Sequence, residues 1–163
     1  MGATTLPPLL RFTPALYAEL IRELARSGEG VSESGAFLLG SLEPHRRVLE
    51  YLLYESVAPE MALEYDYVVL TGNHMAIAWQ RCEQTGLQVV ADIHTHPGLP
   101  MQSRSDREHP IVSIPGHVAL IAPYFAQRSP APADLGVHRF LGEGQWESHF
   151  GGDAQNLLEL SEI

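Results

Sequence analysis

Residues 92–106 read DIHTHPGLPMQSRSD and follow the apolar run LQVVA at residues 87–91, which predicts a buried strand. Side chains two positions apart on a strand point the same way, so His94 and His96 can converge on one ion. Asp106 can return from the following loop as a third ligand. Two imidazoles and one carboxylate leave a fourth position for water, as in catalytic zinc sites. The spacing therefore predicts a Zn2+ site at His94, His96 and Asp106.

Amide hydrolysis at such a site also needs a base that is not a metal ligand, and a donor that stabilises the oxyanion. Glu33 opens the apolar run ESGAFLLG at residues 33–40, a strand with little other use for a carboxylate. Ser103 precedes Asp106 by one helical turn, so both side chains can face the same point. Structural alternatives stay open for all of them: Glu33 as a solvated charge near Glu29, Ser103 as a helix cap, and the two histidines as strand residues that satisfy backbone carbonyls.

Together these residues resemble the JAMM metalloproteases, the catalytically competent branch of the JAB/MPN domain family. That family combines a glutamate on an early strand, His-x-His-Pro at a strand end and Ser-x-x-Asp in the following loop. Pro97, Leu38 and Gly40 also match, and the likeness covers roughly residues 9–142. The resemblance implies that Glu33 is the catalytic base, that Ser103 stabilises the oxyanion, and that the zinc ligands are His94, His96 and Asp106.

The loop after the histidines departs from the family pattern by one residue. Six residues separate His96 from Ser103, where the family commonly has seven. The Ser-x-x-Asp spacing to Asp106 is intact, which indicates a shortened loop before an unchanged turn. This favours Ser103 over Ser105 as the oxyanion donor.

Other histidines and aromatic residues have less specific patterns. His109 and His117 flank the active-site loop, and both a structural role and a role as additional ligands stay open. Trp79 has helical spacing with aliphatic residues and is expected in the core. We expect surface or structural roles for His45, His74 and His138, and either packing or an exposed contact for Trp146 and Phe150.

The composition favours one acidic globular domain. At 163 residues the chain suits a single well-buried domain. Its formal net charge is -10, and no basic cluster extends beyond Arg46–Arg47, which disfavours nucleic acid and anionic membranes as partners. Cys82 is the single cysteine, which excludes an intrachain disulfide and a thiolate zinc cluster. With neither a long apolar run nor a secretory pattern, we expect a cytoplasmic protein.

Periodicity predicts one α+β domain over residues 1–163. The resemblance implies a JAB/MPN-like fold with a mixed, curved β-sheet flanked by helices, a core over about residues 9–142 and a tail over 143–163. One helix begins at Thr13–Pro14 and ends near Ser27–Gly28. Another is capped by Asn73 and stops at Thr85–Gly86. The expected strands are residues 9–12, 35–40, 48–54, 65–70, 87–91 leading into the histidines, 116–123 and 137–141, with a surface loop at 129–134 and a short helix or frayed end from Asp153.

By resemblance, the expected activity is that of a zinc-dependent peptidase or isopeptidase that cleaves after the C-terminus of ubiquitin or a ubiquitin-like modifier in a bacterial conjugation system. Residues 111–123 look similar to JAB proteins that accompany bacterial E1- and E2-like enzymes. The expected partners are therefore the modifier, its conjugates and such enzymes. Two alternatives stay open: processing of a carrier protein's C-terminus in sulfur or cysteine metabolism, and a non-catalytic MPN scaffold.

Overall fold

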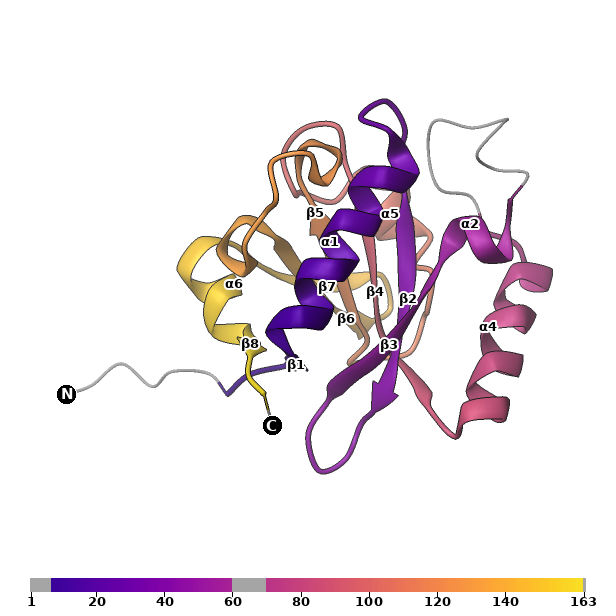
Figure 1. Ribbon diagram of the computed structural model, residues 1–163. Coiled ribbons are helices and arrows are strands. Elements are labelled where there is room, and N and C mark those ends of the chain that lie inside the picture. The colour runs from indigo at the N-terminus through magenta and orange to yellow at the C-terminus, as the bar shows by residue number, and fades with distance from the viewer. Residues whose placement is uncertain (1–6, 60–69, 163) are drawn as a thin grey trace.

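The computed structural model describes residues 7–59 and 70–162, which form one α+β unit around a curved, mixed eight-stranded sheet (Figure 1). The strands lie in the order β7-β6-β5-β4-β2-β3-β1-β8. Three neighbouring pairs are parallel (β4–β5, β1–β3 and β1–β8), and the others are antiparallel. The strands are β1 (Leu10–Phe12), β2 (Gly35–Ser41), β3 (Arg47–Leu53), β4 (Gln88–Thr95), β5 (Val118–Ala122), β6 (Gly136–Gly142), β7 (Gln145–His149) and β8 (Leu158–Leu160). The predicted α+β class and mixed sheet are confirmed.

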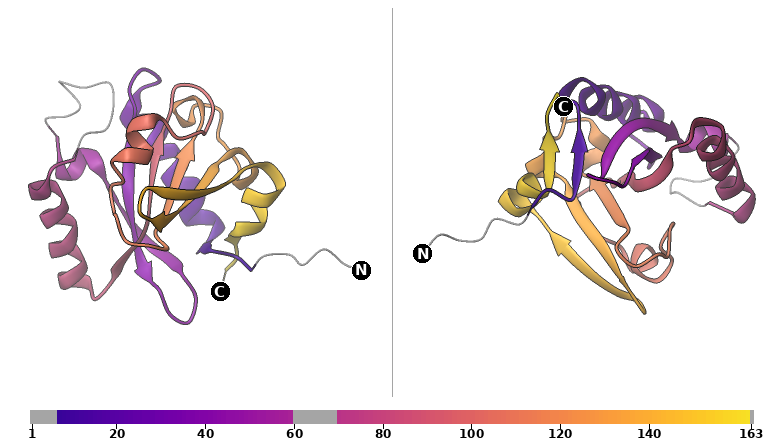
Figure 2. Two further views of the ribbon diagram at one scale, coloured as in Figure 1. Left: turned by 180° about the vertical axis from the view of Figure 1, so that it is seen from behind. Right: turned by 90° about the horizontal axis from the view of Figure 1, so that it is seen from below.

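Helices cover both faces of the sheet, because successive strand residues alternate between two hydrophobic clusters. Leu38 of β2 packs in the larger cluster with α1 (Pro14–Gly28), whereas Phe37 packs in the smaller one with α2 (Tyr54–Val57) and α4 (Gly72–Thr85). Seen from behind, the short α5 (Arg104–Glu108) lies over the face opposite α1 (Figure 2). The other helical segments are α6 (Gly151–Leu157) and the 3₁₀ turns η1 (Tyr124–Ala126) and η2 (Pro132–Asp134).

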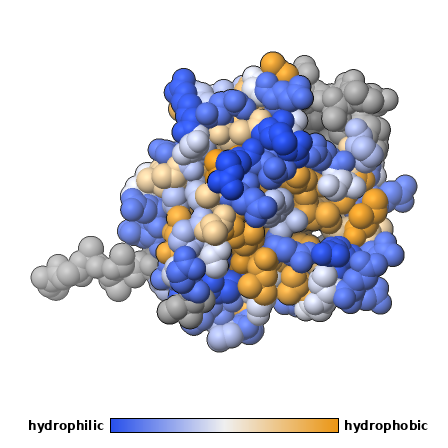
Figure 3. Space-filling model, viewed as in Figure 1, coloured by the Kyte–Doolittle hydropathy of each residue, from blue (hydrophilic) through white to orange (hydrophobic). Residues whose placement is uncertain are grey.

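Helix α1 begins and ends as the sequence predicts. The Thr13 hydroxyl accepts the Leu16 backbone N–H at 3.2 Å, and Pro14 occupies the first turn, where its missing N–H costs nothing. Glu29, with φ 53°, ends the helix in the left-handed conformation. The buried side of α1 carries Tyr17, Leu20, Ile21 and Leu24, and Figure 3 shows that its outward side is hydrophilic.

Helix α4 differs from the prediction at its start and in its buried face. Thr71, not Asn73, is the N-cap, and its backbone N–H donates to His74 Nδ1 at 3.0 Å. Ala78 is the buried residue of the helix, with Met75 and Cys82 partly buried beside it. Trp79 is 45% exposed, so its predicted place in the core is wrong. Helical spacing alone does not determine which side of the helix faces the sheet. Here the side that carries positions 75, 78 and 82 faces it.

The segment from residue 143 onwards supplies both edges of the sheet. β7 pairs with β6, and β8 pairs with β1 in parallel, with Leu158 opposite Leu10. Backbone bonds from Leu9 to Leu157 and from Ser161 to Phe12, and an ion pair between Arg11 and Glu159, fasten this edge. The expected short helix near the end exists as α6, but the strands on either side of it were not predicted.

Two further expectations are met with small shifts. β3 stops at Leu53, since Tyr54 already begins α2, and the loop at residues 129–134 contains the η2 turn. The strand expected at residues 65–70 falls almost wholly outside the described residues. Within the described ranges, every helix is too short or too polar to cross a bilayer.

Candidate metal centre

Strand β4 carries the two histidines to the middle of the sheet. It is paired with β2 on one side and β5 on the other, and His94 lies opposite Gly35 and Ile121. Past the strand end, the backbone N–H of His96 donates to Ala122 O at 2.9 Å. Because hydrogen bonds on both sides fix the register, alternation directs His94 and His96 to the face opposite α1.

A β-carbon on Gly35 would lie 2.4 Å from the Tyr54 ring and 2.7 Å from Ile93 O, so a larger residue beside His94 would force the packing to shift. Glycine at this position therefore lets Tyr54 pack directly over the strand that neighbours the histidines.

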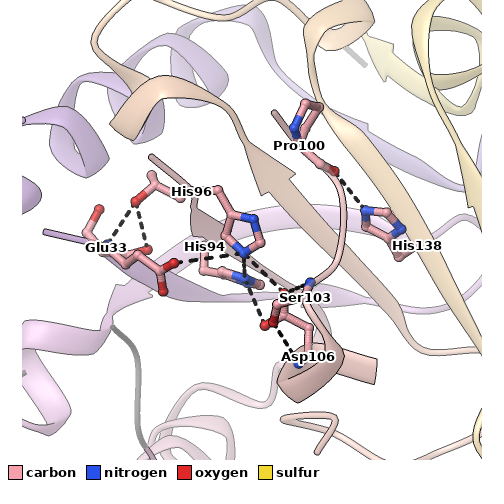
Figure 4. Close-up of polar contacts among 9 residues, drawn as sticks. Glu33, His94, His96, Pro100, Ser103, Asp106 and His138 are labelled. Atoms are coloured by element: carbon pink, nitrogen blue, oxygen red, sulfur yellow. Dashed lines mark hydrogen bonds and ion pairs between the residues drawn. The ribbon is translucent and has the colours of Figure 1, made fainter. Parts of the chain in front are cut away.

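The predicted ligands meet at one point (Figure 4). His94 Nε2 and His96 Nε2 are 3.0 Å apart. Asp106 places Oδ1 3.4 Å from His94 Nε2 and Oδ2 3.1 Å from His96 Nε2. One ligand atom from each residue lies within 4.8 Å of the others.

These distances fit a zinc ion. Bonds of 2.0–2.1 Å in a tetrahedral arrangement place two ligand atoms roughly 3.3 Å apart. Without a cation or extra protons, two imidazole nitrogens and a carboxylate would crowd their lone pairs together. The described residues therefore present a donor set and spacing suited to Zn2+.

Negative charge dominates the site. Burial works against the protonated imidazole of His94, but the hydrogen bond and charge of Asp106 outweigh it, with smaller contributions from Asp92 and Glu33, and raise the pKa of His94. Burial alone would raise the pKa of Asp106, but its bonds to His94 and His96 hold that pKa well below its ordinary value. The carboxylate is therefore ionised at neutral pH, as a metal ligand must be.

Ser103 and Asp106 form a reciprocal cap at the start of α5. Ser103 Oγ accepts the Asp106 backbone N–H at 3.1 Å, and the Ser103 backbone N–H donates to Asp106 Oδ2 at 2.8 Å. The capping alternative for Ser103 is thus confirmed. It does not exclude a catalytic role, because the cap uses the hydroxyl oxygen as an acceptor and a hydroxyl also carries a donor.

Glu33 lies just before β2, on the His96 side of the cluster (Figure 4). Its Oε1 is 3.9 Å from His96 Nε2, and its side chain is 19% exposed. At that distance the carboxylate is a close neighbour of His96. It lies near enough to exchange a proton with a group bound beside His96, as a general base requires.

Two further histidines are separate from the cluster. His117 Nε2 is 2.6 Å from Asp92 Oδ2, and both residues are buried, which confirms the structural alternative for His117. His109 is exposed and lines a cavity of about 30 Å³ together with His94 and Asp106. Neither is among the residues whose ligand atoms converge. Strand alternation could have placed Asp92 on the same face as His94, but no sequence pattern pointed to His117 as its partner.

The surface alternative for His138 is wrong and the structural one holds, since the residue is 1% exposed. Its Nε2 is 3.0 Å from Pro100 O, in the loop between His96 and Ser103 (Figure 4). Trp146, for which packing and an exposed contact were both open, packs on Phe140 at 5.0 Å between ring centroids. Its indole N–H also donates to Arg107 O at 3.0 Å.

No family model matches the chain. The fold is similar to the solution structure of protein DSY2949 from Desulfitobacterium hafniense, with a TM-score of 0.64, 15% sequence identity and coverage of 94% of each chain. It is also similar to the solution structure of a protein from Salinibacter ruber, with a TM-score of 0.56, 19% identity and coverage of 93% of this chain and 92% of the other. These identities are too low to transfer an activity. The TM-scores show that the chain shares the fold of these two proteins.

Proposed function

We propose that this chain is a zinc-dependent peptidase or isopeptidase of the JAMM type within the JAB/MPN family. The observation that carries the proposal is the convergence of His94, His96 and Asp106 within 4.8 Å, with Glu33 3.9 Å from His96 Nε2. Three ligands and a nearby carboxylate are the parts that hydrolysis of an amide by a catalytic zinc requires. The sequence resemblance supplies the same four residues in the same order.

Each side chain has a distinct role in this proposal. A bound zinc ion would lower the pKa of its water toward ~7 and polarise the scissile carbonyl. Glu33 takes the proton of the attacking water and delivers it to the leaving amine. The Ser103 hydroxyl donates to the oxygen of the carbonyl under attack, while its own oxygen continues to cap α5. Asp106 stays ionised because its contacts with the two histidines hold its pKa low.

The proposed substrate is the extended C-terminal tail of a ubiquitin-like protein, or its lysine conjugate. Exposed apolar side chains lie in the segments that carry the site residues: Val31 is 70% exposed shortly before Glu33, and Leu99 and Met101 are 61% and 58% exposed in the loop after His96. We expect the tail to bind in extended form, held mainly by main-chain hydrogen bonds, with these apolar side chains in contact with it. A cytoplasmic setting with E1- and E2-like partners belongs to the same proposal.

Replacement of Glu33 separates catalysis from metal binding. We expect Glu33→Gln to keep one zinc per chain and to lower turnover by roughly 10²- to 10⁴-fold, because the substitution removes the general base and leaves all three metal ligands in place. The matched control is Glu29→Gln at the end of α1, which should behave as the wild type. Zinc content by elemental analysis and turnover by intact mass give the two readouts. Near-wild-type turnover in Glu33→Gln would sink the assignment, as would wild-type protein that binds no zinc after purification without chelator.

A substrate panel identifies the bond that is cleaved. Ubiquitin-like proteins would carry a peptide extension, a single-residue extension or a lysine isopeptide, each assayed with and without chelator. All ten basic residues of the chain are arginine, so the protein has no lysine of its own on which a conjugate could form. Cleavage of the single-residue extension alone would favour carrier-protein processing. Zinc binding with no cleavage of any of the three would favour a scaffold.

A further inference from the structure

The β6–β7 hairpin holds both ends of the segment that carries Asp106. At one end, His138 Nε2 of β6 is 3.0 Å from Pro100 O. At the other, Trp146 Nε1 of β7 donates to Arg107 O at 3.0 Å. Asp106 lies between these two attachment points, next to Arg107.

The first attachment is a close packing of loop on strand. A β-carbon on Gly136, two residues before His138, would lie 2.0 Å from Pro100 O. Only glycine at that position lets the loop rest directly on β6. The His138 ring is fixed from its other side by Ser148 Oγ, 2.7 Å from Nδ1, and by the edge-on ring of Phe150 at 5.6 Å.

The hydrogen-bond partners define how His138 is protonated. A carbonyl only accepts, so Nε2 carries the hydrogen that bonds Pro100 O. Nδ1 is then the acceptor for the Ser148 hydroxyl. Burial lowers the pKa of His138 to about 4, so this neutral arrangement holds at neutral pH.

Within the described ranges, α5 has few attachments to the sheet apart from the contacts of Asp106 with His94 and His96. The helix is five residues long and none of them is buried, so core packing does not locate it. The reciprocal cap between Ser103 and Asp106 is internal to the turn and does not tie it to the sheet. Tyr124 N–H reaches Gly98 O at 3.0 Å, at the very start of the loop. Outside the ligand cluster itself, the hairpin therefore supplies the attachments that hold the backbone of residues 100–107.

We propose that His138 and Trp146 are positioning residues, which hold residues 100–107 so that the Asp106 carboxylate meets His94 and His96. This inference rests on the proposed zinc site. Neither residue touches the metal or the reacting groups. Both act through the backbone of the segment that carries the third ligand, as groups behind a ligand do in other metal sites.

The test measures metal affinity and local order instead of turnover. His138→Phe keeps the ring beside Phe150 but loses the donor, and Trp146→Phe keeps the packing on Phe140 but loses the indole N–H. We expect each to weaken Zn2+ affinity roughly tenfold in a chelator competition, while the ratio of one zinc per chain is kept. The visible spectrum of the Co2+ form should change, because the carboxylate ligand is displaced. His138→Gln, which keeps an N–H donor, should recover part of the affinity, and Trp79→Phe on α4 is the matched control.

Amide hydrogen exchange of the metal-free protein keeps this inference distinct from the proposed function. Faster exchange in residues 100–107 of Trp146→Phe, with the central strands unchanged, is the expected result. If the wild type binds no zinc, the proposed function fails, and the exchange experiment still tests the hairpin. Unchanged exchange together with unchanged Zn2+ affinity in both phenylalanine variants would overturn the inference. If His138→Phe does not fold, Trp146→Phe decides the matter alone.

Discussion

Strand β4 contributes to two groups of histidine and aspartate, and the two differ in how their polar atoms are satisfied. Asp92 and His117 form a closed pair at 2.6 Å, with side chains 2% and 5% exposed. Two residues further along, His94 and His96 meet each other and Asp106 at 3.0 to 3.4 Å, with several acceptors around one point. A closed pair needs nothing more, whereas the crowded cluster is relieved by a cation. Residue type alone does not distinguish a structural pair from a metal site.

The two groups are also coupled. The charge of Asp92 adds to that of Asp106 in raising the pKa of His94. The pair thus contributes negative potential beneath the site while its own hydrogen bond keeps it out of the ligand set. Substitutions in one group at a time test whether the Asp92–His117 pair supports stability and the cluster of His94, His96 and Asp106 binds metal.

Removal of a ligand should have the largest effect. We expect Asp106→Ala to lower zinc affinity roughly a thousandfold and abolish turnover, because three protein ligands become two. His96→Ala should do the same. Both variants should stay folded, since none of the three ligands belongs to the hydrophobic clusters of the sheet. Zinc titration against a competing chelator checks the result. Undiminished zinc content would point to another ligand, with His109 the first to examine.

Breaking the pair between Asp92 and His117 should affect the stability of the fold more than the binding of metal. His117→Ala leaves the Asp92 carboxylate buried without its partner, and we expect a loss of roughly 2 to 4 kcal/mol in the free energy of unfolding. One zinc per chain should still bind. Denaturant unfolding of the metal-free protein gives the stability. His117→Gln, which keeps a donor, is the control and should lose less. A loss of zinc without a loss of stability would reverse the roles assigned to the two groups.

The pH dependence of stability extends the comparison to a fourth buried histidine, His138. The pKa of His138 is about 4, below its ordinary value, so the unfolded chain takes up a proton near pH 6.5 that the folded protein resists. Stability therefore falls as the pH drops from about 6.5 to about 4, by up to about 3 kcal/mol from this group. His138→Gln should lose correspondingly less over that range. Parallel stability curves for the two proteins would contradict the assignment.

Sequence patterns predicted what a single segment encodes. Thr13 and Pro14 specify the start of α1 by themselves, and His94 and His96 share a face because any strand alternates. Glu33 is the exception, since it lies about sixty residues earlier in the chain than the histidines. Its place at the start of an apolar strand made it a candidate, but that local pattern left the alternative of a solvated glutamate open, and the family resemblance supplied its role.

Features decided by a distant partner were not predictable. Trp79 has the same helical spacing as a core residue, but the sheet meets the stripe that contains Ala78. His138 is buried because the loop at Pro100 folds onto it from 38 residues earlier. β7 and β8 are short strands in a glycine-rich or polar context, and their pairing with β6 and β1 defines them more than their own composition does.

The pairing of β1 with β8 has a consequence for the time course of synthesis. Arg11 and its partner Glu159 are 148 residues apart, so one side of β1 has no neighbour until nearly the whole described chain has emerged. At about 5 to 20 residues per second on the ribosome, that delay is roughly 7 to 30 seconds. The edge of β1 is open to other strands throughout this interval. Completion of the sheet is therefore a late event in synthesis, and β4, which carries His94 and pairs with β2 and β5, does not have to wait for it.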